Sequence, residues 1–529
     1  MYDSLLLGGW VVDGTGNPAR RADVAIQGDR IAAVGCLRTA QAKRVFDVTG
    51  KLICPGFIDA HSHTDVTVEA NPYFESTIRQ GITTEVVGNC GDSTAPVPPG
   101  GGGGFGRIGG GAAAQKRSLA EHMRFLESRG MSANLAWLVG DNTLRSIAGI
   151  KGPDYTPEQY QVMERELRKA LDDGALGMSS GLEFEPGRAC RPEELYQLTG
   201  VLKEYDAIYT SHIRNRDAGV LEALEEFLHC IRLNGIRGEV SHMNIRHRTH
   251  APDYAFDRCI AMIQQARDDG FDVLTDMTPL NYGIGQMAGI LPQWLTGMPP
   301  EQLGPALRDP QVRARLRSDC DRYWRFIAAG EWDRVRMQNN RAFPEINGMT
   351  FPEISRLWNK DPWDCYFDIL AAVAPDLDSV VLVSYLFTDE HLKETISHPL
   401  YMLVVDGYST DIEGPAGQAT GFPLHYIGMA WFLTHHVREL HTLRLEEAVR
   451  KMTSMPAQHF GLSGRGLVHE GYFADLCVFA YDKLETPFDL DRPRQYTRGM
   501  DYVFVNGCLV LDGGVHLHTQ PGRHLRRGQ

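Results

Sequence analysis

The stretch GFIDAHSHTD, residues 56–65, decides how the rest of the chain is interpreted. An apolar run ends there, and two histidines follow one residue apart, His61 and His63. In an extended strand the side chains at positions i and i+2 lie on the same side. The two imidazoles would therefore leave the end of a strand together, as a metal-binding pair does. Histidines with this spacing are also common in ordinary loops, so the pair alone leaves both interpretations open.

Short β-rich runs alternate with helical segments on the C-terminal side of this stretch. The segment TPEQYQVMERELRKALDDG at 156–174 is typical of the helices. With the run that contains 56–65, the candidate strands number eight, and the other seven are TTEVVGNC, NLAWLVG, GALGMSSG, AIYTSH, GEVSHM, FDVLTDM and YMLVVDG. Eight strands with intervening helices predict the fold class α/β and a (β/α)8 TIM-like barrel. A ninth candidate, SVVLVSYL at 379–386, is interpreted as an extra strand after an insertion.

Both ends of the chain read as β structure and predict a second domain. Hairpin signals occur at Gly28-Asp29 and at Asn506-Gly507, each between two short β-rich runs. We expect residues 1–52 and 468–529 to form a small β-sandwich domain, and residues 53–467 to form the barrel. A helical insertion at about 285–350 would lie near the mouth of the barrel.

Composition narrows the class of protein. The 529 residues are 43% hydrophobic and carry a formal net charge of −14, which disfavours nucleic acid and anionic membranes as partners. No apolar run is long enough to cross a bilayer, the start lacks the features of a signal peptide, and the ten cysteines show no framework spacing. These features predict a cytoplasmic protein with a small-molecule partner. The sequence leaves the oligomeric state open.

A glycine-rich segment, PPGGGGGFGRIGGGAAA at 98–114, contains a formal Gly-x-Gly-x-x-Gly match. A dinucleotide fingerprint should directly follow a strand and open a helix. Here prolines precede the match and more glycines follow it, so we interpret the segment as a low-complexity loop.

The ends of the predicted strands carry the chemistry. Barrel enzymes place their reactive groups at the C-terminal ends of the strands. The side chains found there are, in chain order, His61, His63, Cys90, His212, His242, Asp276 and Asp406. Each has a purely structural alternative: a buried thiol, a hydrogen-bonded core histidine, or an aspartate that caps a turn. The repeated placement at one rim favours a metal site.

Several motifs carry a resemblance to a known family. They are GFIDAHSHTD, VVGNCG, DDGALGMSSGLEFEPG, SHIRN, SMPAQHFGL and GYFADLCVF. Together they resemble the amidohydrolase superfamily, and the likeness is greatest to its N-acyl-D-amino-acid deacylase (D-aminoacylase) branch. The resemblance covers nearly the whole chain, and is weakest in the glycine-rich loop and in parts of 285–400.

The resemblance implies roles for the residues at the strand ends. Cys90, His212 and His242 would be the ligands of one tightly bound Zn2+. A second, weaker metal position would take His61, His63 and Asp406, and Asp406 would also shuttle the proton. Asp276 would orient a ligand histidine. Many relatives bridge two metals with a modified lysine on strand four, whereas this chain has Met178-Ser179-Ser180 there.

The chain also departs from the branch at positions that concern the substrate. Phe184 stands where the branch usually has tyrosine, and Asn244 where it usually has lysine. These differences remove donors that would hold a carboxylate or an oxyanion. Replacement cations are offered by the arginines that follow the two strand-end histidines, Arg214, Arg216, Arg246 and Arg248, although all four could instead be solvated loop residues.

These observations predict a zinc-dependent amidohydrolase that cleaves a non-peptide C–N bond, with an N-acyl amino acid of D configuration or a related amide as substrate. Two alternatives stay open. One is a hydrolase of cyclic amides or imides, and the other is a non-hydrolytic relative that acts on a specialised metabolite.

Overall fold

The computed structural model describes residues 1–97, 118–246, 249–319, 324–419 and 421–528. The glycine-rich segment at 98–114 and Arg248 lie outside the described residues. No helix among the described residues is both long and apolar enough to span a membrane.

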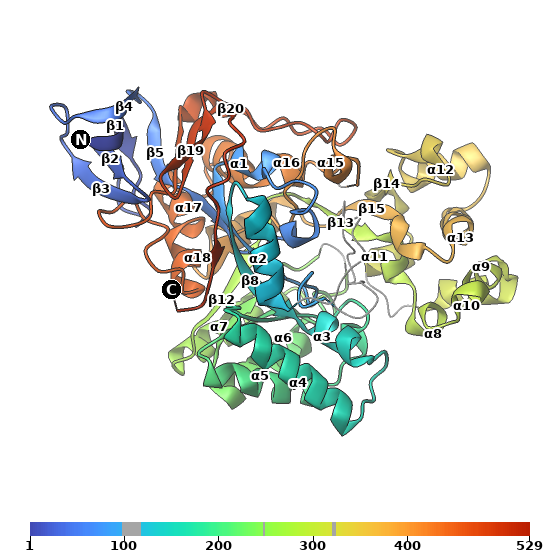
Figure 1. Ribbon diagram of the computed structural model, residues 1–529. Coiled ribbons are helices and arrows are strands. Elements are labelled where there is room, and N and C mark those ends of the chain that lie inside the picture. Colours follow the sequence, from blue (N-terminus) through green and yellow to red (C-terminus); the bar gives the residue numbers. More distant parts are fainter. Residues whose placement is uncertain (98–117, 247–248, 320–323, 420, 529) are drawn as a thin grey trace.

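A parallel barrel forms the centre of the molecule and confirms the predicted fold class (Figure 1). Around the sheet its strands are β6 (Phe57–Asp59), β7 (Ile82–Val87), β8 (Asn134–Gly140), β9 (Gly177–Gly181), β10 (Ile208–His212), β11 (Arg237–Val240), β12 (Val273–Met277) and β16 (Tyr401–Leu403). Pairing between the first and last strands comes just beyond their ends, through the parallel bridge between Ser62 and Gly407. Most residues of these strands are buried, because helices cover the outside and side chains fill the inside.

The helices around the barrel begin and end where sequence signals place them. α4 (Pro157–Asp172) starts with a capping box between Thr156 and Gln159, and its apolar face, including Leu167 and Leu171, is buried. The others beside the strands are α2 (Leu119–Arg129), α3 (Asp141–Ala148), α5 (Pro192–Glu204), α6 (Val220–Asn234), α7 (Ala255–Asp268), α14 (Asp389–Ser397), α16 (Leu424–Trp431), α17 (Leu445–Lys451) and α18 (Ser454–His459).

Both ends of the chain meet in a second sheet, at the left of Figure 1. It contains β1 (Tyr2–Val11), β2 (Arg20–Gln27), β3 (Arg30–Gly35), β4 (Ala42–Asp47), β5 (Leu52–Pro55), β17 (Leu476–Phe479), β18 (Met500–Val505), β19 (Cys508–Asp512) and β20 (Val515–His516). The chain passes from this sheet into the barrel at Gly56. A Cβ there would lie 2.2 Å from Thr83 Oγ1, so only glycine allows this close approach.

The C-terminal segment divides between the two sheets. β17 to β20 pair within the small sheet, whereas β21 (His524–Leu525) pairs with β8 of the barrel. There the Trp137 Nε1–H donates to His524 Nδ1 at 2.9 Å, and the His524 Nε2–H donates to the Met123 carbonyl at 3.0 Å. This segment therefore lies along the amino-terminal half of β8 in the barrel rather than extending the small sheet.

A large insertion separates β12 from β16, and it lies at the right of Figure 1. Its sheet is antiparallel, and its elements are β13 (Tyr282–Gln286), α8 (Gln293–Thr296), α9 (Pro300–Arg308), α10 (Pro310–Ser318), α11 (Arg325–Ala328), β14 (Val335–Asn339), α12 (Phe351–Trp358), α13 (Pro362–Val373) and β15 (Val381–Tyr385). The range expected from the sequence, 285–350, lies within it. β15 is the extra strand seen in the sequence at 379–386, and it pairs here, outside the barrel.

Candidate metal centre

A strained turn places Cys90 over the mouth of the barrel. Cys90 has a φ of 52°, in the left-handed region, and its neighbours Gly88 and Gly91 have φ values of 81° and 78°. A Cβ on Gly88 would lie 2.2 Å from the Leu138 carbonyl oxygen. The two glycines of the Gly-Asn-Cys-Gly motif are therefore required by the backbone, which turns sharply at the end of β7. Among the other candidates His242 (φ 36°) and Asp406 (φ 55°) are also left-handed, and such strain concentrates at functional sites.

Backbone pairing brings the histidine pair against Asp406. β6 ends at Asp59, so the loop beyond it, rather than the strand itself, carries His61 and His63. The Asp406 N–H donates to the His61 carbonyl at 2.9 Å, and the His63 N–H donates to the Gly407 carbonyl at 2.8 Å. The first and last barrel strands thus stay in register past their ends. Their side chains meet at one rim for this reason.

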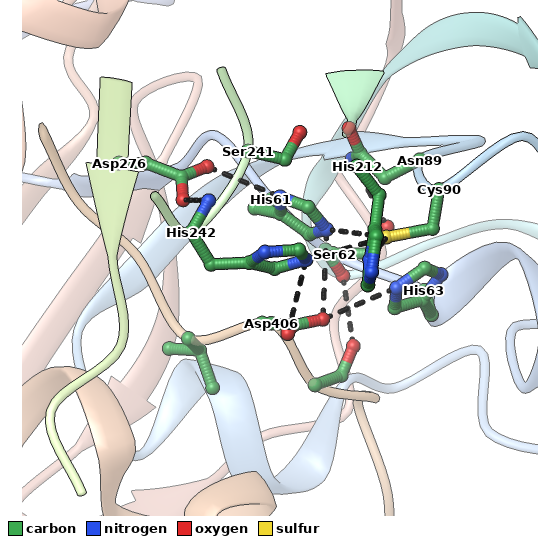
Figure 2. Close-up of polar contacts among 12 residues, drawn as sticks. His61, Ser62, His63, Asn89, Cys90, His212, Ser241, His242, Asp276 and Asp406 are labelled. Carbon is green, nitrogen blue, oxygen red and sulfur yellow. Dashed lines mark hydrogen bonds and ion pairs between the residues drawn. The ribbon is translucent and has the colours of Figure 1, made fainter. Parts of the chain in front are cut away.

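Four candidate imidazoles, those of His61, His63, His212 and His242, surround the Cys90 thiol and the Asp406 carboxylate (Figure 2). Cys90 Sγ lies 3.2 Å from His61 Nε2, 3.6 Å from His212 Nδ1 and 3.5 Å from His242 Nε2. Asp406 Oδ1 lies 3.5 Å from His61 Nε2. Donor atoms of His61, Cys90, His242 and Asp406 all lie within 4.8 Å of one another.

His63 joins the cluster through the carboxylate. Its Nε2 lies 3.2 Å from Asp406 Oδ1, and its ring centroid is 5.5 Å from that of His61. The Asp406 side chain is 29% exposed, whereas the histidine side chains of the cluster are nearly or fully buried. Asp406 therefore faces both the cluster and the space that a small molecule would enter.

The donor set fits a zinc ion. With Zn–S and Zn–N bonds of usual length, a sulfur and a nitrogen on one tetrahedral zinc are about 3.5 Å apart. The distances from Cys90 Sγ to His212 and His242 match this value. A thiolate with imidazoles is a donor set that zinc prefers, and three protein ligands leave a position for water or substrate.

Charges within the cluster shift the pKa of each group. Burial raises the pKa of the Cys90 thiol, but His61 and His212 outweigh burial and hold that pKa well below its usual value. Burial lowers the pKa of His61, while the Cys90 thiolate raises it to well above its usual value. For His242, burial and Arg216 both lower the pKa. The thiol is therefore held in its ionised form, in which it binds metal.

The same balance acts on the carboxylate. Burial raises the pKa of Asp406, but the charges of His61 and His63 outweigh burial and hold it below its usual value. Burial lowers the pKa of His63, and Asp406 and Cys90 raise it to about 10. The charges of His61 and His63 thus favour the ionised form of Asp406.

Two buried carboxylates contact the imidazole nitrogens of His61 and His212 that face away from Cys90. Asp276 Oδ2 lies 3.1 Å from His61 Nδ1, and its other oxygen accepts from the His242 backbone N–H. Glu183 Oε2 lies 2.6 Å from His212 Nε2. Sequence reasoning named Asp276 but missed Glu183. Its position directly before Phe184, just after a barrel strand, was the available signal.

A cavity of about 120 Å³ opens beside the cluster. Its walls include residues from the strand ends, from β13 and from the loop after β15, among them Phe184, Asn244, Tyr282, Ile284, Phe387 and Tyr408. Phe184 packs edge-on against His212, with ring centroids 4.6 Å apart. Asn244 is buried, and among the described residues its Nδ2 has no hydrogen-bond partner. The cavity wall therefore combines apolar side chains with polar ones, and the Asn244 amide is an available donor there.

The structure shows which of the arginines lines the cavity, a question that the sequence left open. Arg216 lines the cavity and is the one lysine or arginine among its described lining residues. Its Nη1 lies 2.7 Å from His242 Nδ1, and it donates to the His242 carbonyl at 3.0 Å and to Asn244 Oδ1 at 3.2 Å. Arg214 instead forms a two-pronged pair with Glu226, at 2.8 and 2.9 Å, and does not line the cavity. Of the four arginines offered by the sequence as replacement cations, Arg216 is the one that the described part of the structure places on the wall of this cavity.

Comparison with known proteins agrees with this geometry. The family model described as Amidohydrolase family matches residues 44–205 and 416–511. The N-acyl-D-glutamate deacylase of Alcaligenes xylosoxydans xylosoxydans is 33% identical over 528 residues, which covers 99% of this chain and 96% of that relative.

Solved structures show the same likeness. A crystal structure of D-aminoacylase superposes with a TM-score of 0.83 at 27% identity, covering all of both chains. The N-acyl-D-glutamate deacylase of Bordetella bronchiseptica, complexed with zinc and a phosphonate that mimics the tetrahedral intermediate, has a TM-score of 0.78 at 30% identity and covers 99% of each chain. The chain belongs to the amidohydrolase superfamily, in its N-acyl-D-amino-acid deacylase branch.

Proposed function

We propose that this protein is a zinc-dependent deacylase that hydrolyses an N-acyl-D-amino acid or a related amide. The observation that carries the proposal is the meeting of the Cys90 thiol, several imidazoles and the Asp406 carboxylate beside one cavity. Zinc and deacylation are supported by the relatives, among them the zinc-bound deacylase with its phosphonate inhibitor.

Cys90, His212 and His242 would hold the tighter zinc ion, and His61, His63 and Asp406 would form a second position. A bound zinc ion supplies an acidified water and polarises the amide carbonyl. The chain's own residues orient the metal ligands and shape the cavity beside them. Asp276 orients the His61 ring, and the apolar wall around Phe184 excludes bulk water.

Asp406 is the proposed proton carrier. Its carboxylate is ionised, partly exposed and directed into the cavity. It would accept the proton of the attacking water and then donate that proton to the leaving amine nitrogen.

Arg216 is the proposed anchor of the substrate carboxylate. A buried carboxylate needs a charge-assisted partner, and Arg216 is the cation on the described cavity wall. The Nδ2 of Asn244 adds a neutral donor beside it. This pair would replace the lysine that the branch usually has at position 244.

The test is hydrolysis by the zinc-loaded protein of a matched panel: N-acetyl-D-leucine, N-acetyl-D-glutamate, N-acetyl-L-leucine and a hydantoin. We expect cleavage of D-acyl amino acids, loss of activity after chelation, and recovery with zinc. Preferential opening of the hydantoin ring would support the cyclic-amide alternative. A zinc-loaded protein that cleaves no member of the panel would contradict the proposal.

A further inference from the structure

Glu183 lies directly behind the metal-facing ring of His212. Its Oε2 is 2.6 Å from His212 Nε2, and its side chain is only 6% exposed. A carboxylate carries no hydrogen, so the Nε2–H of His212 must be the donor. The other nitrogen, Nδ1, then keeps its lone pair, and it is this atom that lies 3.6 Å from Cys90 Sγ. Glu183 therefore determines which nitrogen of His212 can bind a metal.

Glu183 is itself held in a fixed orientation. Arg246, whose side chain is fully buried, donates from Nη1 to Glu183 Oε1 at 3.0 Å and from Nη2 to Oε2 at 2.5 Å. A two-pronged pair between a guanidinium and a carboxylate fixes the plane of the carboxylate. Arg216 Nη2 lies 3.7 Å from the same Oε2. The orientation of His212 is thus set by two neighbouring cations through Glu183.

The ion pairs behind Glu183 continue into the insertion. Arg246 Nη1 lies 3.9 Å from Asp217 Oδ2, and Asp217 Oδ1 lies 3.5 Å from Arg325 Nε. Arg325 belongs to α11, and Asp217 is buried. Alternating charges therefore connect the insertion to the ring of His212.

We propose that Glu183 is a positioning residue, which together with Arg246 orients His212 for zinc binding. The inference rests on the proposed function only in that the site binds zinc. The competing explanation is an ion pair that merely stabilises the fold. Another buried pair, Arg145 with Glu194, provides the comparison: its atoms are 2.5 and 2.7 Å apart, both side chains are fully buried, and it contacts none of the proposed ligands.

The test compares zinc dissociation constants, measured by competition with a chromophoric chelator. Removing Glu183 alone would leave the buried Arg246 without the carboxylate to which it donates, so both are replaced in Glu183→Leu/Arg246→Met. We expect this variant to bind zinc about 10–100-fold more weakly. The matched control, Glu194→Leu/Arg145→Met, should bind zinc as wild type does, even where its melting temperature falls. The visible spectrum of the cobalt-loaded protein should change only in the first variant.

A folded Glu183→Leu/Arg246→Met protein with wild-type zinc affinity would overturn the inference. If that variant does not fold, Glu183→Gln decides. Glutamine keeps the size and one acceptor oxygen but loses the charge, so zinc binding should weaken by less than in the double variant, and unchanged affinity would again overturn the inference. Failure of the wild-type protein to bind zinc would instead count against the proposed function.

Discussion

The two ends of the barrel bury polar groups in opposite ways. At the amino end, Trp137, His524 and the Met123 carbonyl form a chain of neutral hydrogen bonds, and burial lowers the pKa of His524 to about 4. At the carboxyl end, ionised groups face one another, and Cys90 and Asp406 adopt left-handed backbone conformations. The difference indicates that one end stabilises the fold, whereas the other holds strained, charged groups for chemistry.

If the carboxyl end is devoted to chemistry, the largest effect should come from Asp406→Asn. The amide keeps the size of the side chain but cannot carry the proton, so kcat should fall by about 10²–10⁴-fold. Turnover of the preferred acyl amino acid and zinc content, measured on the same sample, check this. Wild-type turnover in a zinc-loaded variant would remove Asp406 from the mechanism.

The next largest effect should come from Cys90→Ser. A hydroxyl is a poorer zinc ligand than a thiolate, so zinc affinity should fall by about 100-fold or more. Chelator competition measures the loss. Cys190→Ser is the control, because Cys190 is also a buried thiol but does not contact the cluster, and its zinc affinity should not change. Equal losses in both variants would contradict the assigned ligand.

Arg214 and Arg216 allow a comparison within the carboxyl end, because only Arg216 lines the cavity. Arg216→Met should raise KM for a carboxylate-bearing substrate by about 10–100-fold, the value of a charge-assisted hydrogen bond. For the corresponding substrate with a carboxamide in place of the carboxylate, the same substitution should raise KM far less. Arg214→Met removes a cation that pairs with Glu226 outside the cavity, so its KM should stay near wild type. The reverse pattern would assign the anchoring role to Arg214 instead.

The amino end should affect stability alone. His524→Ala leaves the buried Nε1–H of Trp137 without its acceptor, which costs about 1–3 kcal/mol of unfolding free energy. Chemical denaturation measures the cost, and zinc affinity should be unchanged. His518→Ala is the control: that side chain is 53% exposed, and its pair with Glu75 should contribute little. A fall in zinc affinity in His524→Ala would show that the two ends are coupled.

Much of this arrangement could be predicted from local patterns. Alternating β-rich and helical runs indicated the barrel, and the turn residues Asn506-Gly507 correctly marked a hairpin between β18 and β19. The tendency of barrel enzymes to carry reactive groups at the C-terminal ends of their strands pointed to the residues that the structure brings to one rim. These predictions succeed because periodicity and turn chemistry depend on neighbours in the sequence.

Other features depended on contacts between distant segments. Nothing near Glu183 in the sequence indicates Arg246, which is 63 positions away. Arg214 and Arg216 point to different places because the Arg214 side chain pairs with Glu226, whereas the Arg216 side chain contacts His242. The pairing of β21 with β8 likewise joins residues nearly 400 positions apart, and no short-range signal marks it.

By itself the sequence determined the barrel, the family and the side chains able to bind a metal, because the order of the strands and the groups at their ends can be read directly from the chain. The tertiary structure alone decided which nitrogen of His212 faces Cys90, which arginine lines the cavity, and where β21 pairs. Those outcomes depend on buried charges and buried polar groups finding partners across the fold, since an unpaired charge or polar group in the interior would be too costly to keep.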